Sequence, residues 1–146
     1  IFNIALSFLA NTKISKILIP KSVGLCDVAT FKNCVNLTSI VFEDGGDVPL
    51  YVGGDLWLEN TQVTILVLPF KTYRIRGYWR RGSNLNTLYV KSTIPPILEH
   101  GWGDNPDTCD LYVPIGCKEV YASATNWGSF RTITEYDFDL NPNNVH

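Results

Sequence analysis

The chain has 146 residues, of which 45% are hydrophobic and 18% charged, as is ordinary for a folded domain with one core. Its net charge of −2 at pH 7 argues against nucleic acid or an anionic membrane as a partner. No apolar run approaches the ~20 residues needed to cross a bilayer, so we expect no transmembrane segment.

The opening residues, IFNIALSFLA, resemble the apolar part of a secretory signal, but no basic residue precedes them. Phe8 and Ile14 have a spacing that recurs along the chain, so we interpret this stretch as folded core. A start in mid-repeat without Met indicates a fragment or a mature form of a longer protein.

A repeat of 22 to 26 residues extends through most of the chain, and each copy begins with a large aromatic residue: Phe8, Phe31, Trp57, Trp79 and Trp102. The sixth residue after each aromatic is apolar in four of the five copies: Ile14, Leu37, Val63, Leu85 and, as the exception, Thr108. Two further apolar residues follow at fixed offsets: Ile17/Ile19, Ile40/Phe42, Leu66/Leu68, Leu88/Val90 and Leu111/Val113. Such a period is typical of a solenoid, in which each copy buries its apolar face against its neighbours. The sequence therefore predicts that the aromatics are stacked in file.

Each copy has a loose L-x-x-L-x-L pattern, whose alternating end predicts a short strand with one buried face. Pro20, Pro69 and Pro114 follow three of these strands. The remaining residues are too few, and too rich in Asn, Gly and Asp, for long helices. We expect an extra loop at 43–49 and one column of side chains that bond turn backbone: Asn11, Cys34, Asn60 and Asn105.

The C-terminal part predicts a cap that covers the last layer of the core. Pro114 and Gly116 end the last repeat strand, and residues 118–125 can form two helical turns with Val120 and Tyr121 facing inward. We expect the apolar side chains of Trp127, Phe130 and Ile133 to cover the last layer of the core. The tail at 141–146 has no such pattern.

Several stretches resemble the BspA-like leucine-rich repeats of surface proteins from gut and oral Bacteroidetes. The segments KILIPKSV (16–23), TFKNCVNLTSIVF (30–42) and GGDLWLENTQVTILVLP (53–69) carry the resemblance. Residues 19–23 and 29–34 match the family's IP-x-SV and A-F turn segments, whereas Trp57 and Trp79 replace the family's Phe. Residues 111–135 are similar to the family's terminal cap, so the resemblance covers about residues 5–136.

The resemblance implies an α/β leucine-rich repeat solenoid, mostly β with little helix, with a parallel sheet on one face and irregular turns on the other. One domain of about five repeats is expected at 1–136, including the cap at about 111–136, with a tail at 137–146. The family implies a non-catalytic module, exported to the cell surface or secreted, for recognition of a protein or glycan. It would be a monomer or part of a larger chain, with no cofactor.

The exposed face of the predicted sheet is the candidate binding surface. In each predicted strand, one outward-facing residue lies between the two buried residues of the repeat. Stacked strands would align these outward-facing side chains in one column: Leu18, Val41, Val67, Tyr89 and Tyr112. An apolar stripe that ends in two tyrosines is suited to docking. The same residue types also stabilise a sheet through neighbour packing alone. A passive spacer within a larger surface protein is therefore the alternative function.

The sequence offers no catalytic motif, and we expect neither a catalytic residue nor a metal site. A hydrolase would need His100 beside a Ser and a carboxylate, since the other histidine, His146, ends the chain. Calcium binding remains open for two acidic loops: Glu43, Asp44, Asp47 and Asp55, and Asp104, Asn105 and Asp107.

Two further groups of side chains have competing interpretations. The cluster of Arg74, Arg76, Arg80 and Arg81 is interpreted as a solvated surface, with acidic glycan, polyanion or protein contact as alternatives. The chain has four cysteines, which are interpreted as reduced structural thiols: Cys26, Cys34, Cys109 and Cys117. A local disulfide bridge between Cys109 and Cys117 remains open.

Overall fold

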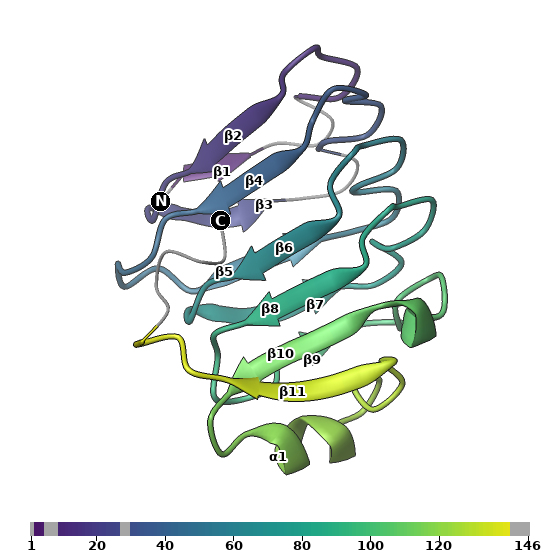
Figure 1. The fold of residues 1–146 in the computed structure, drawn as a ribbon. Helices are drawn as coiled ribbons and strands as arrows, with labels where there is room; N and C mark the ends of the chain where they lie inside the picture. Colours follow the sequence, from purple (N-terminus) through teal and green to yellow (C-terminus); the bar gives the residue numbers. More distant parts are fainter. Residues whose placement is uncertain (1, 5–8, 27–29, 141–146) are drawn as a thin grey trace.

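The computed structural model describes residues 2–4, 9–26 and 30–140, which form a mostly-β parallel solenoid of about five turns (Figure 1). The predicted solenoid and its repeat of about 23 residues are confirmed. The one α-helix of the described part has six residues, so the chain is mostly β and not α/β. Phe8 and His146 lie outside the described residues.

The first sheet lies along one side of the coil and contains the strands that the repeat predicts, followed by the strand of the cap: β2 (Lys16–Ile19), β4 (Ser39–Phe42), β6 (Ile65–Leu68), β8 (Thr87–Val90) and β10 (Asp110–Pro114), then β11 (Thr132–Tyr136). All neighbouring strands that pair do so in parallel. β2 pairs with β4, and β6, β8, β10 and β11 form a second ladder. The interruption between β4 and β6 falls in the longest repeat, which carries the predicted extra loop at 43–49 between β4 and the next strand.

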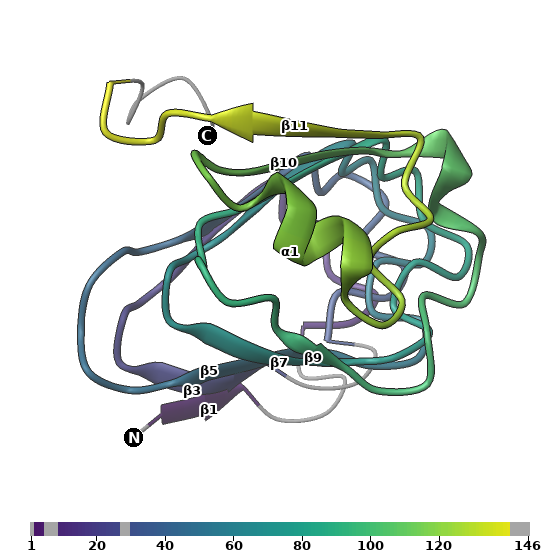
Figure 2. The same cartoon turned by 90° about the horizontal axis from the view of Figure 1, so that it is seen from below.

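A second sheet occupies another side of the coil, where the sequence analysis expected irregular turns, and that expectation was wrong. Its five parallel strands are β1 (Phe2–Ile4), β3 (Val23–Cys26), β5 (Leu50–Gly53), β7 (Thr72–Arg76) and β9 (Ile97–Leu98). Figure 2 shows the two sheets on opposite sides, with the turns closing the coil between them. Buried residues are three apart in β3 and β7, and the pairing of β5 with β7 has a register shift between Leu50 and Tyr51, so these strands give no clear period of two.

The predicted file of aromatic rings is confirmed and forms the axis of the core. Ring centroids lie 5.3 Å apart for Phe31 and Trp57, 5.5 Å for Trp57 and Trp79, and 5.5 Å for Trp79 and Trp102. The file continues into the cap with Trp127, 5.0 Å from Trp102. Mostly edge-to-face contacts of this kind add about 0.5–1.5 kcal/mol per pair beyond burial.

The asparagine column on the turn side differs in two members from the prediction, at Cys34 and at Asn105. Asn11, Asn33 and Asn60 share positive φ angles of 62°, 59° and 57°. Their amides form a ladder, because Asn33 donates to Asn11 at 3.1 Å and Asn60 donates to Asn33 at 2.8 Å. Cys34 is instead buried and donates to the carbonyl of Leu9 at 3.0 Å, so it still bonds turn backbone.

Asn105, also assigned to that column, has another role. It caps the short 3-10 helix η1 (Pro106–Thr108), where its side chain accepts a hydrogen bond from the backbone N–H of Asp107 at 3.2 Å. The asparagine ladder therefore does not extend to this turn, and the polar side chains of the fifth coil serve local capping.

The predicted cap is present as a helix, α1 (Lys118–Ser123), followed by β11, which pairs along the full length of β10. Tyr121 is buried and its hydroxyl donates to the carbonyl of Ser92 at 2.8 Å, while the indole of Trp127 donates to the carbonyl of Pro96 at 2.9 Å. Val120, predicted to face inward, is exposed, because the short helix buries only Tyr121.

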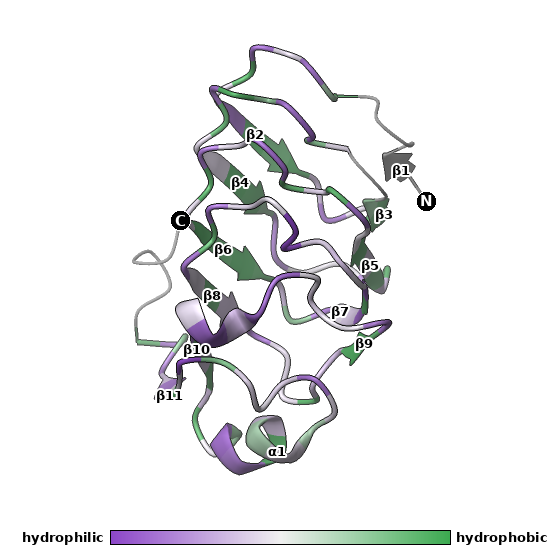
Figure 3. Cartoon of the chain, turned by 90° about the vertical axis from the view of Figure 1, so that its right-hand side faces the viewer, coloured by the Kyte–Doolittle hydropathy of each residue, from purple (hydrophilic) through white to green (hydrophobic). Residues whose placement is uncertain are grey.

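Hydropathy follows this architecture. Figure 3, viewed from the turn side, shows the two sheets on either side of the coil, with strands such as β6 and β5 coloured as hydrophobic. In the part of the chain that the structure describes, no helix has the length and apolar character needed to cross a membrane.

Candidate functional site

The predicted docking column is assembled as expected on the outer face of the first sheet. Strand pairing places Leu18 beside Val41, and aligns Val67, Tyr89 and Tyr112. Leu18 is 60% exposed, whereas the other four members are half-buried. The column is therefore most open to solvent at its N-terminal end.

The chain's own aromatic residues cover the C-terminal end of this column. Tyr89 and Tyr112 stack with centroids 4.5 Å apart, and the ring of Tyr136 meets Tyr89 edge-on at 5.2 Å. Phe138, beyond β11, also approaches Tyr89, at 6.3 Å. Burial in this cluster raises the pKa of Tyr89. The two tyrosines are therefore partly committed to intramolecular packing.

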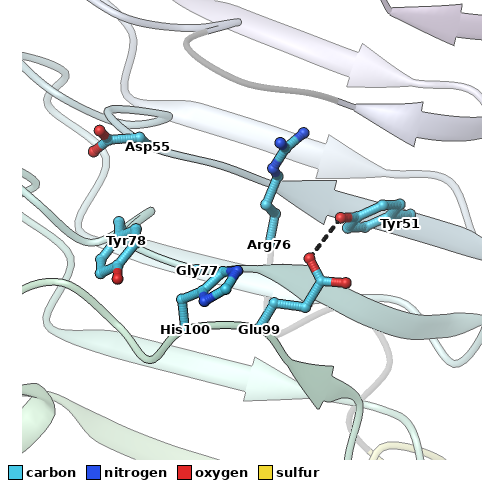
Figure 4. Close-up of a pocket in the computed structure, with 7 residues that line it drawn as sticks. All are labelled: Tyr51, Asp55, Arg76, Gly77, Tyr78, Glu99 and His100. Carbon is cyan, nitrogen blue, oxygen red and sulfur yellow. Dashed lines mark hydrogen bonds between the residues drawn. The ribbon is translucent and has the colours of Figure 1, made fainter.

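A polar cleft on the other side of the coil was not predicted as a site. It has a volume of about 450 Å³ and lies where the strands of the second sheet end and enter the turns (Figure 4). Its walls come from three successive coils: Tyr51, Asp55, Arg76, Gly77, Tyr78, Glu99 and His100.

The carboxylates of the cleft are held by neighbouring groups. The hydroxyl of Tyr51 donates to Glu99 at 2.8 Å, and Arg74 lies 3.3 Å from the other oxygen of the same carboxylate. Arg81 lies 3.4 Å from Asp55. Desolvation, together with the hydrogen bond and negative charge of Glu99, raises the pKa of Tyr51, so its hydroxyl stays protonated at neutral pH.

The aromatic wall of the cleft depends on unusual backbone conformations. Tyr78 and His100 have φ angles of 64°, in the left-handed region that is uncommon for residues other than Gly, Asn, Asp and His, so Tyr78 is the less usual of the two. Their rings stack with an interplanar angle of 7° and centroids 6.0 Å apart. Gly77 is required here, because a Cβ at this position would lie 1.8 Å from the carbonyl oxygen of Glu99.

The sequence analysis considered some of the residues that line the cleft, but it did not predict that they lie together. Asp55, Arg76 and His100 each belonged to another hypothesis, and none of the other lining residues was named there as a site residue. A prediction that these residues lie in one cleft would have required the pairing of β5 with β7 and of β7 with β9. That pairing belongs to the sheet that the sequence analysis missed.

The four arginines do not form one solvated surface, so that interpretation requires correction. Arg80 is buried, and its guanidinium donates to the carbonyls of Asn105 at 2.7 Å and Leu85 at 3.0 Å, and to that of Asp104 at 3.3 Å. It joins the turns of adjacent coils. Arg74, Arg76 and Arg81 surround the cleft.

The four cysteines are all buried in the core. Cys109 and Cys117, between which a bridge remained open, are free and lie just before and just after β10. Burial raises the pKa of the Cys109 thiol to about 11, so the reactive thiolate is scarce at neutral pH.

The acidic loops, considered as calcium ligands, pair with other protein groups. Asp44 binds Lys91 at 2.5 Å, Glu43 accepts the backbone N–H of Lys21 at 2.9 Å, and Asp104 accepts that of Gly82 at 2.9 Å. Among the described residues, no group of three or more His, Cys, Asp or Glu side chains could hold a metal ion.

Together, the repeat, the two parallel sheets and the capped end define the class of the chain as a parallel β-solenoid protein. No protein-family model and no curated protein sequence matches the chain.

Proposed function

We propose that the chain is a non-catalytic recognition module of the leucine-rich repeat type, displayed on the cell surface or secreted, that binds a protein or glycan. The observation that carries this proposal is the open part of the first sheet, where the exposed Leu18 lies beside the half-buried Val41 and is followed by the half-buried Val67 on β6. Exposed apolar surface of this kind commonly marks an interaction site.

The family assignment in this proposal depends on the sequence motifs. The resemblance to BspA-like repeats, including the A-F turn and the cap, accounts for both the period and the end of the coil. The fold alone supports no particular ligand, because one solenoid architecture serves many functions.

Substitution on the open sheet tests the proposal. The purified chain would be assayed on immobilised extracellular-matrix proteins and on a glycan array, beside a Leu18→Lys/Val67→Lys variant. Val35→Lys is the matched control, because Val35 is exposed but lies in a turn. We expect the double substitution to reduce binding at least tenfold and the control to leave it unchanged.

Two results would contradict the proposal. If no probe binds, or if binding survives the double substitution with the fold intact by circular dichroism, the docking surface is wrong. The chain would then fit the passive spacer better, since a spacer requires only the stable coil.

A further inference from the structure

We propose that the chain forms a two-fold dimer through an exposed apolar surface at one corner of the coil. The surface lies where the strands of the first sheet end and the chain turns toward the second sheet or the cap (Figure 2). Five large apolar side chains are exposed there, and we call them the apolar corner: Phe70, Tyr73, Ile94, Ile97 and Ile115. The inference goes beyond the proposed function, which rests on the docking column of the first sheet.

The apolar corner is one continuous surface to which three successive coils contribute. Phe70 follows β6, Ile94 lies in the connection from β8 to β9, and Ile115 follows β10. All members except Ile115 line one hollow of about 330 Å³, and Ile115 joins them because it shares a second hollow with Phe70. These exposed side chains are therefore gathered in one place and are not scattered singly.

The exposed area is large enough for a contact between two copies. The exposed fractions of the five residues range from 47% at Tyr73 to 75% at Ile94, which corresponds to on the order of 600 Å² in total. The largest apolar patch of a typical monomer is about 300–600 Å². Specific interfaces bury about 600–1,000 Å² on each partner, so the apolar corner with its rim reaches the size that a dimer needs.

The low charge at the centre of this surface favours a second copy over an acidic or basic partner. Among the described residues that line the first hollow, Lys71 alone is charged, and its ammonium donates to the carbonyl of Lys21 in the same chain. Charged groups appear at the rim beside Ile115, where Lys91 and Asp137 line the second hollow. A second copy would bring one apolar centre against another inside a polar rim, which is the usual anatomy of an interface.

The shape of the apolar corner suits a two-fold contact, in which each copy offers the same patch to the other. Ile94 is its most exposed member and lies at the first hollow. In a two-fold pair, the Ile94 side chain of each copy can enter the hollow of the other, beside Phe70 of that copy. The same contact then forms twice and removes apolar surface of both chains from water. Because the arrangement closes on itself, it gives a dimer and no longer assembly.

Analytical ultracentrifugation of the full 146-residue chain tests the inference. We expect the mean mass to rise with protein concentration from that of one chain to that of two, and to rise no further. Since an interface near the lower limit of size gives a weak complex, the Kd should be micromolar.

Two single substitutions assign the dimer to the apolar corner. Ile94→Glu would place a charge in the apolar hollow of the other copy, and Phe70→Lys would place a charge in the wall of that hollow. Both residues are exposed, so the fold should be retained, which circular dichroism checks. Each substitution should weaken the dimer at least tenfold. Val35→Glu is the matched control, because Val35 is exposed in a turn and lines neither hollow, and it should leave the Kd unchanged.

An equimolar mixture of the Ile94→Glu and Phe70→Lys chains tests the two-fold geometry. In a mixed dimer, one contact pairs the introduced carboxylate with the introduced ammonium, and the other contact keeps the original Ile94 and Phe70. We therefore expect the mixed dimer to be at least fivefold tighter than the dimer of either variant alone.

Four results would overturn the inference: a chain that is monomeric at every concentration, a mass that rises beyond two chains, a dimer that neither substitution weakens, or a mixture no tighter than the separate variants. A monomeric chain that floats with phosphatidylcholine vesicles, and loses this property on Ile94→Glu, would assign the apolar corner to a lipid surface instead. The Leu18→Lys/Val67→Lys variant should dimerise as the unmodified chain does. Failure of the dimer and failure of the docking column are therefore separate results.

Discussion

The aromatic file makes a quantitative prediction, because two of its tryptophans differ in their hydrogen bonds. Trp79 is fully buried, and its indole N–H has no hydrogen-bond partner among the described residues. Trp102, the next ring in the file, donates from its indole to the carbonyl of Asn126 at 2.6 Å. Phe is tolerated in such a file, as Phe31 shows.

Substitution with Phe separates packing from hydrogen bonding. At either position the smaller ring leaves a void that costs about 1–2 kcal/mol of unfolding free energy, a fraction of the loss on truncation to Ala. Trp102→Phe also loses a hydrogen bond worth about 0.5–1.5 kcal/mol. Trp79→Phe instead removes a buried donor whose desolvation costs about 1–3 kcal/mol. We therefore expect Trp102→Phe to be less stable than Trp79→Phe by about 3 kcal/mol, because the two opposite effects add in the difference between the variants.

Urea unfolding followed by far-ultraviolet circular dichroism measures this difference without depending on tryptophan fluorescence. At a slope of about 1–3 kcal/mol per molar urea, the two midpoints should differ by about 1–3 M. Trp57→Phe should resemble Trp79→Phe, because its indole also lacks a partner among the described residues, and Trp127→Phe should resemble Trp102→Phe. Equal midpoints, or a lower midpoint for Trp79→Phe, would refute the reasoning.

Three further predictions concern groups outside the aromatic file. Arg80→Met should lower the unfolding free energy by about 2–4 kcal/mol, since it leaves turn carbonyls unpaired, whereas the exposed control Arg81→Met should cost less than about 1 kcal/mol in the same urea assay. Asp110 accepts two hydrogen bonds from Arg131, at 2.8 Å each, which lower its pKa to about 2. Because the folded pKa is depressed, the contribution of this carboxylate is complete above pH about 4 and is lost as pH falls toward 2. The stability advantage over Asp110→Asn, about 1 kcal/mol at most for an exposed pair, should disappear in that window, and a constant advantage would contradict the assignment. Finally, an aromatic disulfide reagent at neutral pH should modify the thiols, Cys109 included, only after unfolding in denaturant, and fewer than four equivalents without reductant would indicate a bridge.

The structure also changes the interpretation of several residues that the sequence had marked. Arg80 belongs to a cluster of cationic residues, yet it is buried between turns, because its guanidinium can bond several carbonyls at once. Tyr89 and Tyr112 occupy the predicted column, yet Tyr136 and Phe138 pack against them from beyond the last repeat. In each case contacts with a neighbouring coil or with the cap decide the role of the side chain, and the pattern within one repeat does not show those contacts.

The apolar residues after the last repeat predicted the cap. The repeat period by itself determined the coil, the file from Phe31 to Trp102 and the strands β2, β4, β6, β8 and β10 of the first sheet. Each of these depends on an apolar side chain recurring at a fixed offset, and burial of apolar surface responds to that pattern directly. The second sheet and the cleft at its end were decided only by tertiary structure. Buried residues do not alternate in these strands, since they are three apart in β3 and β7, so the sequence shows no period of two there. Backbone pairing between coils is what brings Tyr51, Tyr78 and Glu99 into one cleft.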